Sequence, residues 1–332
     1  MILNLVFLIV GFIILIKGAD IFVDGASGIA GNFKVSKMLI GLTIVAFGTS
    51  APELAVSIKS LISGSGDMVL GNVIGSNILN ILLILGLSAM FHSLAVKNNT
   101  VKKELPITLM ITTAFAVLLS DSIFTRNVTN SFTRGDGLVL LLFFSVFMYY
   151  LINMSRNKID DDSKDTYPSM KKSILLTILG LIGIVLGSNF VVDGASGVAK
   201  IIGISERMIS LTIVAIGTSL PELVTSLAAT RKGEYDIAIG NVVGSNIFNI
   251  GIVIGIPVAI FGGISKINFS YIDIVVMILS ALFLFIFSYN DHKISRKEGI
   301  FFLLAFIAYY SYVIFGWWIL IWRCNEWFYI YL

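Results

Sequence analysis

The sequence predicts an all-α polytopic membrane protein with ten transmembrane helices in two inverted-topology five-helix repeats. Three observations support this prediction: an apolar composition, a series of apolar runs about one bilayer long, and a long internal repeat. Hydrophobic residues make up 57% of the 332 residues and charged residues only 13%, whereas soluble domains are about 25% charged. So few charges cannot cover a soluble surface, which excludes a cytosolic enzyme, a nucleic-acid-binding protein and a disordered chain.

Apolar runs separated by short polar segments give the expected spans, since a helix needs about 20 residues to cross a bilayer. We expect these spans at 3–30, 37–62, 68–91, 105–121, 136–154, 173–200, 206–230, 236–261, 270–289 and 297–320. The first run has no basic segment before it and no small-residue cleavage site after it. It is therefore expected to be a retained span rather than a signal peptide.

Lysine and arginine are unevenly distributed between the two sets of loops. About 15 fall on one side and about 7 on the other, with Lys17 inside the first span. Since the side richer in these residues usually faces the cytoplasm, we expect a multi-pass protein of the plasma or inner membrane with both termini extracytoplasmic. The acidic run at 160–162 lies in the longest cytoplasmic linker and is expected to be solvated.

The strongest feature is an internal repeat with a constant offset of 169 positions, as between Val23 and Val192. VDGASGIA at 23–30 returns as VDGASGVA at 192–199, LTIVAFGTSAPEL at 42–54 as LTIVAIGTSLPEL at 211–223, and GNVIGSNILNI at 71–81 as GNVVGSNIFNI at 240–250. About 34 of the 71 positions aligned from Gly18 and Gly187 are identical, far above chance for a biased composition. The chain therefore contains a duplicated unit.

The repeat also predicts the domain organisation. We expect a first five-helix repeat over 1–155, a cytoplasmic linker over 156–172 and a second repeat over 173–332. The copies begin five spans apart, an odd number, so the second copy enters the membrane from the opposite side. Inverted repeats of this kind are typical of secondary transporters, whose substrate sites lie near the midplane where the copies meet.

Each copy carries one glutamate inside an apolar run, Glu53 and Glu222. An ionised side chain at the bilayer centre costs about 2.5–3.5 kcal/mol or more, and no nearby lysine or arginine in these runs neutralises either glutamate. Protons or bound cations must therefore balance the charge. A protonated pair that serves only the structure is the alternative, although ionisable groups inside membranes are functional by default.

Oxygen-bearing side chains accompany the two glutamates at helical spacing. Residues four apart share one helix face, and four such pairs occur: Thr49 with Glu53, Thr218 with Glu222, Ser76 with Asn80, and Ser245 with Asn249. Oxygen ligands without sulfur or imidazole favour hard cations such as Ca²⁺ and Na⁺. For the serines and asparagines, interhelical hydrogen bonding is the alternative role.

Two prolines add a backbone source of oxygen. Pro52 and Pro221 each remove the hydrogen bond to the carbonyl four residues earlier, at Gly48 and Gly217. We therefore expect a kink or an unwound turn in each copy, with freed carbonyls that a cation can satisfy. The single cysteine, Cys324, excludes an internal disulfide and a cysteine-based metal site.

At these residues the chain resembles the sodium/calcium exchanger family of the cation/Ca²⁺ antiporter superfamily, and in particular its compact prokaryotic members. GTSAPE and GTSLPE resemble the two signature repeats of that family, and GSNILN and GSNIFN resemble the partner motifs. The resemblance covers nearly the whole chain. It implies a non-enzymatic antiporter that exchanges Na⁺ for Ca²⁺ by alternating access, usually to extrude Ca²⁺.

The resemblance also implies a role for each matching residue. Ca²⁺ would bind Glu53, Glu222, Thr49 and Thr218. Na⁺ would bind Ala46, Thr49, Ser50, Glu53 and Ser245 on one side, and Ala215, Thr218, Ser219, Glu222 and Ser76 on the other, with Asn80 and Asn249 lining the middle. No resident cofactor, nucleic acid or obligatory protein partner is expected, only the transported ions and membrane lipid. Some members and the K⁺-dependent relatives carry Asp at the position of Asn249, so asparagine there weighs against K⁺ dependence.

Three alternatives remain open. A proton-coupled Ca²⁺ or cation antiporter could use the same glutamates, because buried carboxylates titrate readily. An intramembrane aspartyl protease is suggested by Asp67 in GSGD and Asp236 in YD, although helix N-caps explain both residues. A passive channel is the third alternative, against which the inverted repeat argues.

Overall fold

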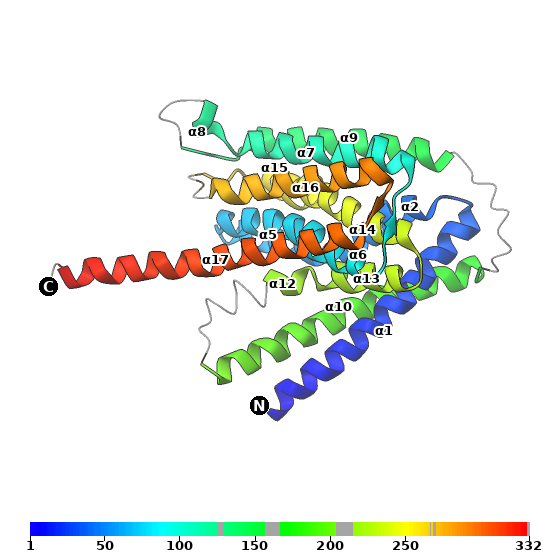
Figure 1. The fold of residues 1–332 in the computed structure, drawn as a ribbon, viewed down its shortest axis with the longest axis horizontal. Helices are drawn as coiled ribbons and strands as arrows, with labels where there is room; N and C mark the ends of the chain where they lie inside the picture. The colour runs from blue at the N-terminus through cyan, green and yellow to red at the C-terminus, as the bar shows by residue number, and fades with distance from the viewer. Residues whose placement is uncertain (125–128, 157–166, 204–214, 266, 268–269, 331–332) are drawn as a thin grey trace.

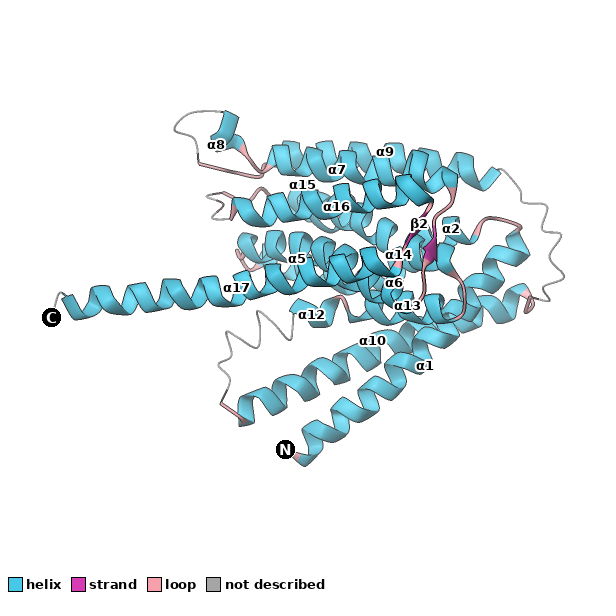
Figure 2. Cartoon of the chain, in the orientation of Figure 1, coloured by secondary structure: helices cyan, strands magenta, loops and turns pink. Residues whose placement is uncertain are grey.

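The computed structural model describes residues 1–124, 129–156, 167–203, 215–265, 267 and 270–330, and these are almost entirely helical (Figure 2). Most helices run alongside one another in a bundle, and α1 and α10 lie side by side along one edge of it (Figure 1). The helices are α1 (Ile2–Phe33), α2 (Lys37–Ile40), α3 (Ala46–Thr49), α4 (Ala51–Ile62), α5 (Gly66–Leu79), α6 (Gly86–Phe91), α7 (Leu105–Leu118), α8 (Asp121–Phe124), α9 (Arg134–Arg156), α10 (Met170–Ile201), α12 (Ala215–Thr218), α13 (Leu220–Arg231), α14 (Tyr235–Phe248), α15 (Gly255–Phe261), α16 (Tyr271–Asp291) and α17 (Arg296–Ile330). Two short strands, β1 (Leu94–Ala95) and β2 (Lys293–Ile294), pair antiparallel.

Seven helices in the described part of the chain are long and apolar enough to cross a membrane. They are Ile2–Phe33, Gly66–Phe91, Arg134–Arg156, Met170–Ile201, Tyr235–Phe261, Tyr271–Asp291 and Arg296–Ile314. The pair Lys37–Thr49 and Ala51–Ile62, bent by 44°, makes an eighth candidate. Of the other two expected spans, 105–121 corresponds to the shorter α7, and the first part of 206–230 lies outside the described residues. The chain is thus an all-helical polytopic membrane protein.

Several of these helices are continued by π-helical turns that the sequence pattern did not predict. They are η1 (Gly41–Val45), η2 (Asn80–Leu85), η3 (Thr100–Glu104) and η5 (Asn249–Ile254). η2 and η5 begin at equivalent repeat positions. A π-helical turn adds a residue to the helix and is frequently found at functional sites, and both of these turns start at an asparagine expected to line the ion site.

The turn between α4 and α5 has the same conformation as the turn between α13 and α14. Gly64 and Gly233 occupy the left-handed region, with φ of 77° and 75°, which glycine adopts without a steric penalty. In each turn the next amide donates to a carbonyl five residues earlier, from Ser65 to Ser60 and from Glu234 to Ala229, both at 2.8 Å. This is the Schellman arrangement, and it directs α5 and α14 back along α4 and α13.

The helices α1 and α10 pack backbone to backbone through glycines spaced seven residues apart. The stripe comprises Gly11, Gly18 and Gly25 on α1 and, at the equivalent repeat positions, Gly180, Gly187 and Gly194 on α10. A Cβ at Gly18 would lie 2.7 Å from the backbone nitrogen of Ile184, and one at Gly187 would lie 2.5 Å from that of Leu15. Because these contacts pair rising with falling residue numbers, the two helices run antiparallel. Small residues allow such close approach inside membranes.

Ion pairs join α1 to the end of α13. Asp24 accepts from the Lys232 ammonium at 2.5 Å, and Asp20 pairs with Arg231. Lys232 also donates to the Asp20 carbonyl, at 2.6 Å. At the equivalent positions at the end of α4, Ile62 and Ser63 replace Arg231 and Lys232, so the first copy has no basic groups there to form the equivalent ion pairs with α10.

Candidate ion-binding site

The site is formed where two membrane helices are interrupted. α3 ends at Thr49, Ser50 departs from helical geometry with φ −85° and ψ 6°, and α4 follows with Pro52 in its first turn. Ser219 separates α12 from α13 in the same way, with φ −91° and ψ 4°. The kink expected from the two proline positions is therefore confirmed in both copies.

Glu53 and Glu222 lie in the first turns of α4 and α13, and each is only 1% exposed. The positive end of a helix dipole lies there and favours a carboxylate. Each carboxylate accepts a hydrogen bond from the other copy: Ser50 donates to Glu222 Oε1 at 2.8 Å, and Ser219 donates to Glu53 Oε1 at 3.3 Å. These crossed bonds place both glutamates in one cluster in which they interact electrostatically.

On the glutamate helices and on the elements packed against them (α14, η2 and η5), five buried side-chain oxygens of residues expected at the ion site have no hydrogen-bond partner among the described residues. They are Glu53 Oε2, Glu222 Oε2, Ser245 Oγ, Asn80 Oδ1 and Asn249 Oδ1. A buried polar group without a partner costs about 1–3 kcal/mol, and more if it is charged. Carboxylate, hydroxyl and amide oxygens are the ligand types that suit a hard cation such as Ca²⁺ or Na⁺.

The remaining predicted residues surround this cluster. The Thr49 hydroxyl lies 3.0 Å from Asn241 Oδ1 and 3.1 Å from the Val45 carbonyl, and Ser76 Oγ lies 3.1 Å from Ser219 Oγ. Ala46 is buried, and its carbonyl accepts from the Ser50 amide at 3.0 Å. Thr218 is half-buried at the end of α12, which begins at Ala215.

One expected ligand is used differently in the structure. Pro221 was expected to free the Gly217 carbonyl for a cation, but that carbonyl accepts from the Ser188 hydroxyl of α10 at 2.9 Å. At the equivalent position of the first copy Ala19 replaces Ser188, so Gly48 cannot be satisfied in the same way. The carbonyl is therefore free of its helical partner, as expected, and a side chain from another helix supplies the missing donor.

Two asparagines that the sequence argument did not single out support the glutamate turns. Asn72 donates to the Glu53 carbonyl and to Ser57 Oγ, both at 3.1 Å. Its repeat equivalent Asn241 donates to the Glu222 carbonyl at 3.3 Å and to Ser226 Oγ at 2.9 Å. The signal that could have found them was their identity in both copies, within GNVIGSN and GNVVGSN.

No basic side chain in the described part of the chain forms an ion pair with Glu53 or Glu222; the ion pairs found there all join other residues. The same residues contain no cluster of three or more His, Cys, Asp or Glu side chains. The donor set is therefore two carboxylates with neutral oxygens.

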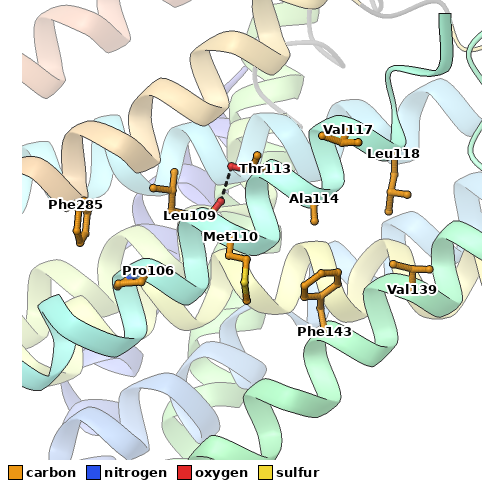
Figure 3. A pocket seen from close by; sticks show the side chains of 10 residues that line it. All are labelled: Pro106, Leu109, Met110, Thr113, Ala114, Val117, Leu118, Val139, Phe143 and Phe285. Atoms are coloured by element: carbon orange, nitrogen blue, oxygen red, sulfur yellow. Dashed lines mark hydrogen bonds between the residues drawn. The ribbon is translucent and has the colours of Figure 1, made fainter. Parts of the chain in front are cut away.

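An apolar groove elsewhere on the bundle lacks this chemistry (Figure 3). It has a volume of about 530 Å³ and lies between α7, α9 and α16, lined by Pro106, Leu109, Met110, Thr113, Ala114, Val117, Leu118, Val139, Phe143 and Phe285. Its one hydroxyl, on Thr113, donates to the Leu109 carbonyl at 2.7 Å. No carboxylate or amide side chain is among the residues that line the groove.

The two aspartates of the protease alternative lie at opposite ends of the bundle. Asp236 pairs with Lys97, which follows the span Gly66–Phe91, whereas Asp67 begins that span. A helix of 26 residues rises about 39 Å, so the two carboxylates cannot act together. The expectation that both aspartates are helix N-caps was wrong. Ser65 and Glu234 occupy the N-cap positions, and the aspartates lie in the first turns of their helices.

A fold of long apolar helices around a buried oxygen cluster with two carboxylates defines a membrane ion transporter. The family described as sodium/calcium exchanger protein matches residues 3–153 and 172–315. The chain therefore belongs to the sodium/calcium exchanger family, and it resembles the compact prokaryotic members.

Several known proteins are similar to this chain over almost their full length. The putative antiporter CaxA of Alkalimonas amylolytica is 39% identical over 95% of this chain and 100% of its own. The sodium/calcium exchanger MaX1 of Methanosarcina acetivorans is 33% identical over 92% of this chain and 97% of its own. The solved structure of the sodium-calcium exchanger NCX_Mj, soaked with Na⁺ and no Ca²⁺, superposes with a TM-score of 0.82 at 35% identity, covering 93% of this chain and 98% of that one. These relatives are transporters, which is in keeping with a non-enzymatic role.

Proposed function

We propose that the protein is a secondary active antiporter that exchanges Na⁺ for Ca²⁺ by alternating access and usually extrudes Ca²⁺. The observation that carries this proposal is that Glu53 Oε2 and Glu222 Oε2 are buried without a hydrogen-bond partner in the described structure, while crossed serine bonds link each glutamate to the other copy. Relatives named as sodium/calcium exchangers share the fold and most of the chain length.

The proposed ligands are those expected from the sequence. Ca²⁺ binds Glu53, Glu222, Thr49 and Thr218; Na⁺ binds Ala46, Thr49, Ser50, Glu53 and Ser245, or Ala215, Thr218, Ser219, Glu222 and Ser76; and Asn80 and Asn249 line the centre. Both ions use the same carboxylates, so their binding is mutually exclusive. The formal charge of −2 is neutralised by one Ca²⁺, whereas three Na⁺ would leave a surplus of one, and exchange of three for one would be electrogenic.

The proposed architecture has ten spans in two inverted halves, 1–155 and 173–332, joined by the cytoplasmic linker 156–172, with both termini outside. The antiparallel packing of the equivalent helices α1 and α10 supports the inversion. In this mechanism α1 and α10 move past the rest of the bundle. An empty site would carry two uncompensated charges through an apolar environment, so only loaded states switch and the ions exchange rather than leak.

Flux measurements in proteoliposomes test the proposal. Uptake of ⁴⁵Ca²⁺ into Na⁺-loaded vesicles should require the Na⁺ gradient and should be abolished by Glu53→Gln or Glu222→Gln. Glu104→Gln is the matched control, because Glu104 is also fully buried but accepts a hydrogen bond from Tyr150 and forms none with the cluster; it should retain transport. Uptake that survives without the Na⁺ gradient would overturn the proposal.

The proton-coupled antiporter is the second candidate, because the two carboxylates that would bind cations can also carry protons. The same vesicles distinguish it. A pH gradient imposed without Na⁺ should leave uptake at background if Na⁺ is the coupling ion. Uptake driven by that gradient alone would identify protons as the coupling ion.

A further inference from the structure

Four buried asparagines form a closed hydrogen-bonded group between the two copies. They are Asn77, Asn80, Asn246 and Asn249, each no more than 2% exposed. We propose that Asn77 and Asn246 are positioning residues, which fix the amides of the central asparagines so that carbonyl oxygen rather than NH₂ faces the ions. This inference rests on the proposed function and deepens it by assigning two residues that would not touch the ions themselves.

The bonds are crossed between the copies. Asn80 Nδ2 donates to Asn246 Oδ1 at 2.9 Å, and Asn249 Nδ2 donates to Asn77 Oδ1 at 3.2 Å. Asn246 Nδ2 in turn donates to the Asn77 carbonyl at 3.3 Å, and Asn77 Nδ2 to the Asn246 carbonyl at 3.5 Å. The 169-residue offset converts each bond into another bond of the group. The arrangement is therefore built into both halves of the molecule.

The group leaves two oxygens without a partner, and they belong to the central pair. Asn80 Oδ1 and Asn249 Oδ1 are buried and accept no hydrogen bond in the described structure, while all Oδ1 and Nδ2 atoms of Asn77 and Asn246 are used. Asn77 and Asn246 thus hold the other pair in place. Asn80 and Asn249 present the oxygens that are available to a cation.

Orientation decides whether an asparagine amide can face a cation. Its oxygen accepts and carries partial negative charge, whereas its NH₂ donates and carries partial positive charge. A rotation of 180° about the last side-chain bond exchanges them. Because the Nδ2 of Asn80 is directed to Asn246, such a rotation would place two oxygens against each other and leave an NH₂ buried without an acceptor. Asn246, as the anchor of the Asn80 amide, therefore selects the orientation that suits a cation.

A double-mutant cycle on Na⁺-dependent ⁴⁵Ca²⁺ flux tests this role. Asn246→Ala should raise the half-saturating Na⁺ concentration about threefold to tenfold, and Asn80→Ala should raise it by at least as much. The double variant Asn246→Ala with Asn80→Ala should be no worse than Asn80→Ala alone, because the anchor has nothing left to orient. Asn246→Ala with Asn249→Ala should instead show the product of the two single effects.

The crossed pattern separates positioning from general support of the fold. A second cycle uses the equivalent residues: Asn77→Ala is combined with its hydrogen-bond partner Asn249→Ala and, separately, with Asn80→Ala, which it does not bind. This cycle tests the positioning role if an Asn246 variant does not fold. Thermal unfolding in detergent is recorded for every variant, and a purely structural role would lower stability without distinguishing the partner from the non-partner. Equal coupling to both central asparagines, or no coupling to either, would overturn the inference. Loss of the Na⁺ requirement in the unmodified protein would instead overturn the proposed function.

Discussion

Ser188 illustrates how a single side chain makes the two halves of the site unequal. Pro221 removes the amide that would have satisfied the Gly217 carbonyl, and the Ser188 hydroxyl replaces it at 2.9 Å. The first copy has Ala19 at the equivalent position and so no such hydroxyl. The second helix break is therefore held to α10 by a hydrogen bond that the first break lacks on α1.

Replacing Ser188 by alanine should destabilise the protein by about 1–3 kcal/mol, because it leaves a buried carbonyl without a donor. Ser27→Ala is the matched control: Ser27 is a buried serine of α1 whose hydroxyl has no partner among the described residues, so its removal should cost nothing. Thermal unfolding in detergent measures both. Equal melting temperatures for the two variants would contradict the assignment.

At the scale of elements, the glycine stripe between α1 and α10 gives a steric prediction. A Cβ at Gly187 would lie 2.5 Å from the backbone nitrogen of Leu15, so Gly187→Ala must push the two helices apart and should cost about 1–3 kcal/mol or more. Gly71→Ala is the control, because a Cβ at this helical glycine meets nothing within 4 Å. It should be neutral or stabilising. Flux and thermal unfolding of the two variants should diverge accordingly.

The ion pairs between α1 and α13 should influence the rate of exchange. In this structure Lys232 contacts Asp24 and the Asp20 carbonyl of α1. If α1 moves past the bundle, these contacts stabilise only one of its positions, and Lys232→Ala removes them. Exposed pairs contribute about 0.2–1 kcal/mol, so turnover should change by up to about fivefold while the half-saturating Na⁺ concentration stays the same. Asp193→Asn, at the position equivalent to Asp24, where Ser63 replaces the lysine at the end of α4, should leave turnover unchanged. An identical effect of both variants would contradict this role.

At the scale of the molecule, the proposed inverted arrangement predicts the side of the membrane on which equivalent residues are exposed. Ser63 and Lys232 occupy the same position in the two equivalent turns, 169 residues apart. Single cysteines introduced at these sites in a Cys324→Ser background should react with a membrane-impermeant maleimide from opposite sides. Labelling of both from one side would exclude the inversion.

The sequence predicted the features that depend on composition and local pattern. Apolar runs identified the helices, the prolines identified the breaks at Ser50 and Ser219, and the intramembrane position of the carboxylates singled out Glu53 and Glu222. The structure brings these two residues into one cluster through crossed serine bonds, as the repeat suggested.

The partners that come from other helices were not predictable in this way. Ser188 lies 29 residues from the carbonyl that it satisfies, and Asn77 lies 172 residues from Asn249. Hydrogen bonds at such separations depend on how the helices pack, which no local period encodes. The repeat did hold part of this information, since asparagines 72, 77 and 80 all recur 169 positions later, but identity alone does not reveal which amide binds which.

The seam between α1 and α10 has a consequence for how access to the site is controlled. Each helix comes from a different half, yet they meet with so little room that neither can shift sideways without the other. In the proposed mechanism, a displacement that uncovers the glutamates on one face would carry the second helix along and cover them on the other. Under this proposal, the close packing of the two backbones obstructs simultaneous opening to both aqueous compartments, which would dissipate the ion gradient.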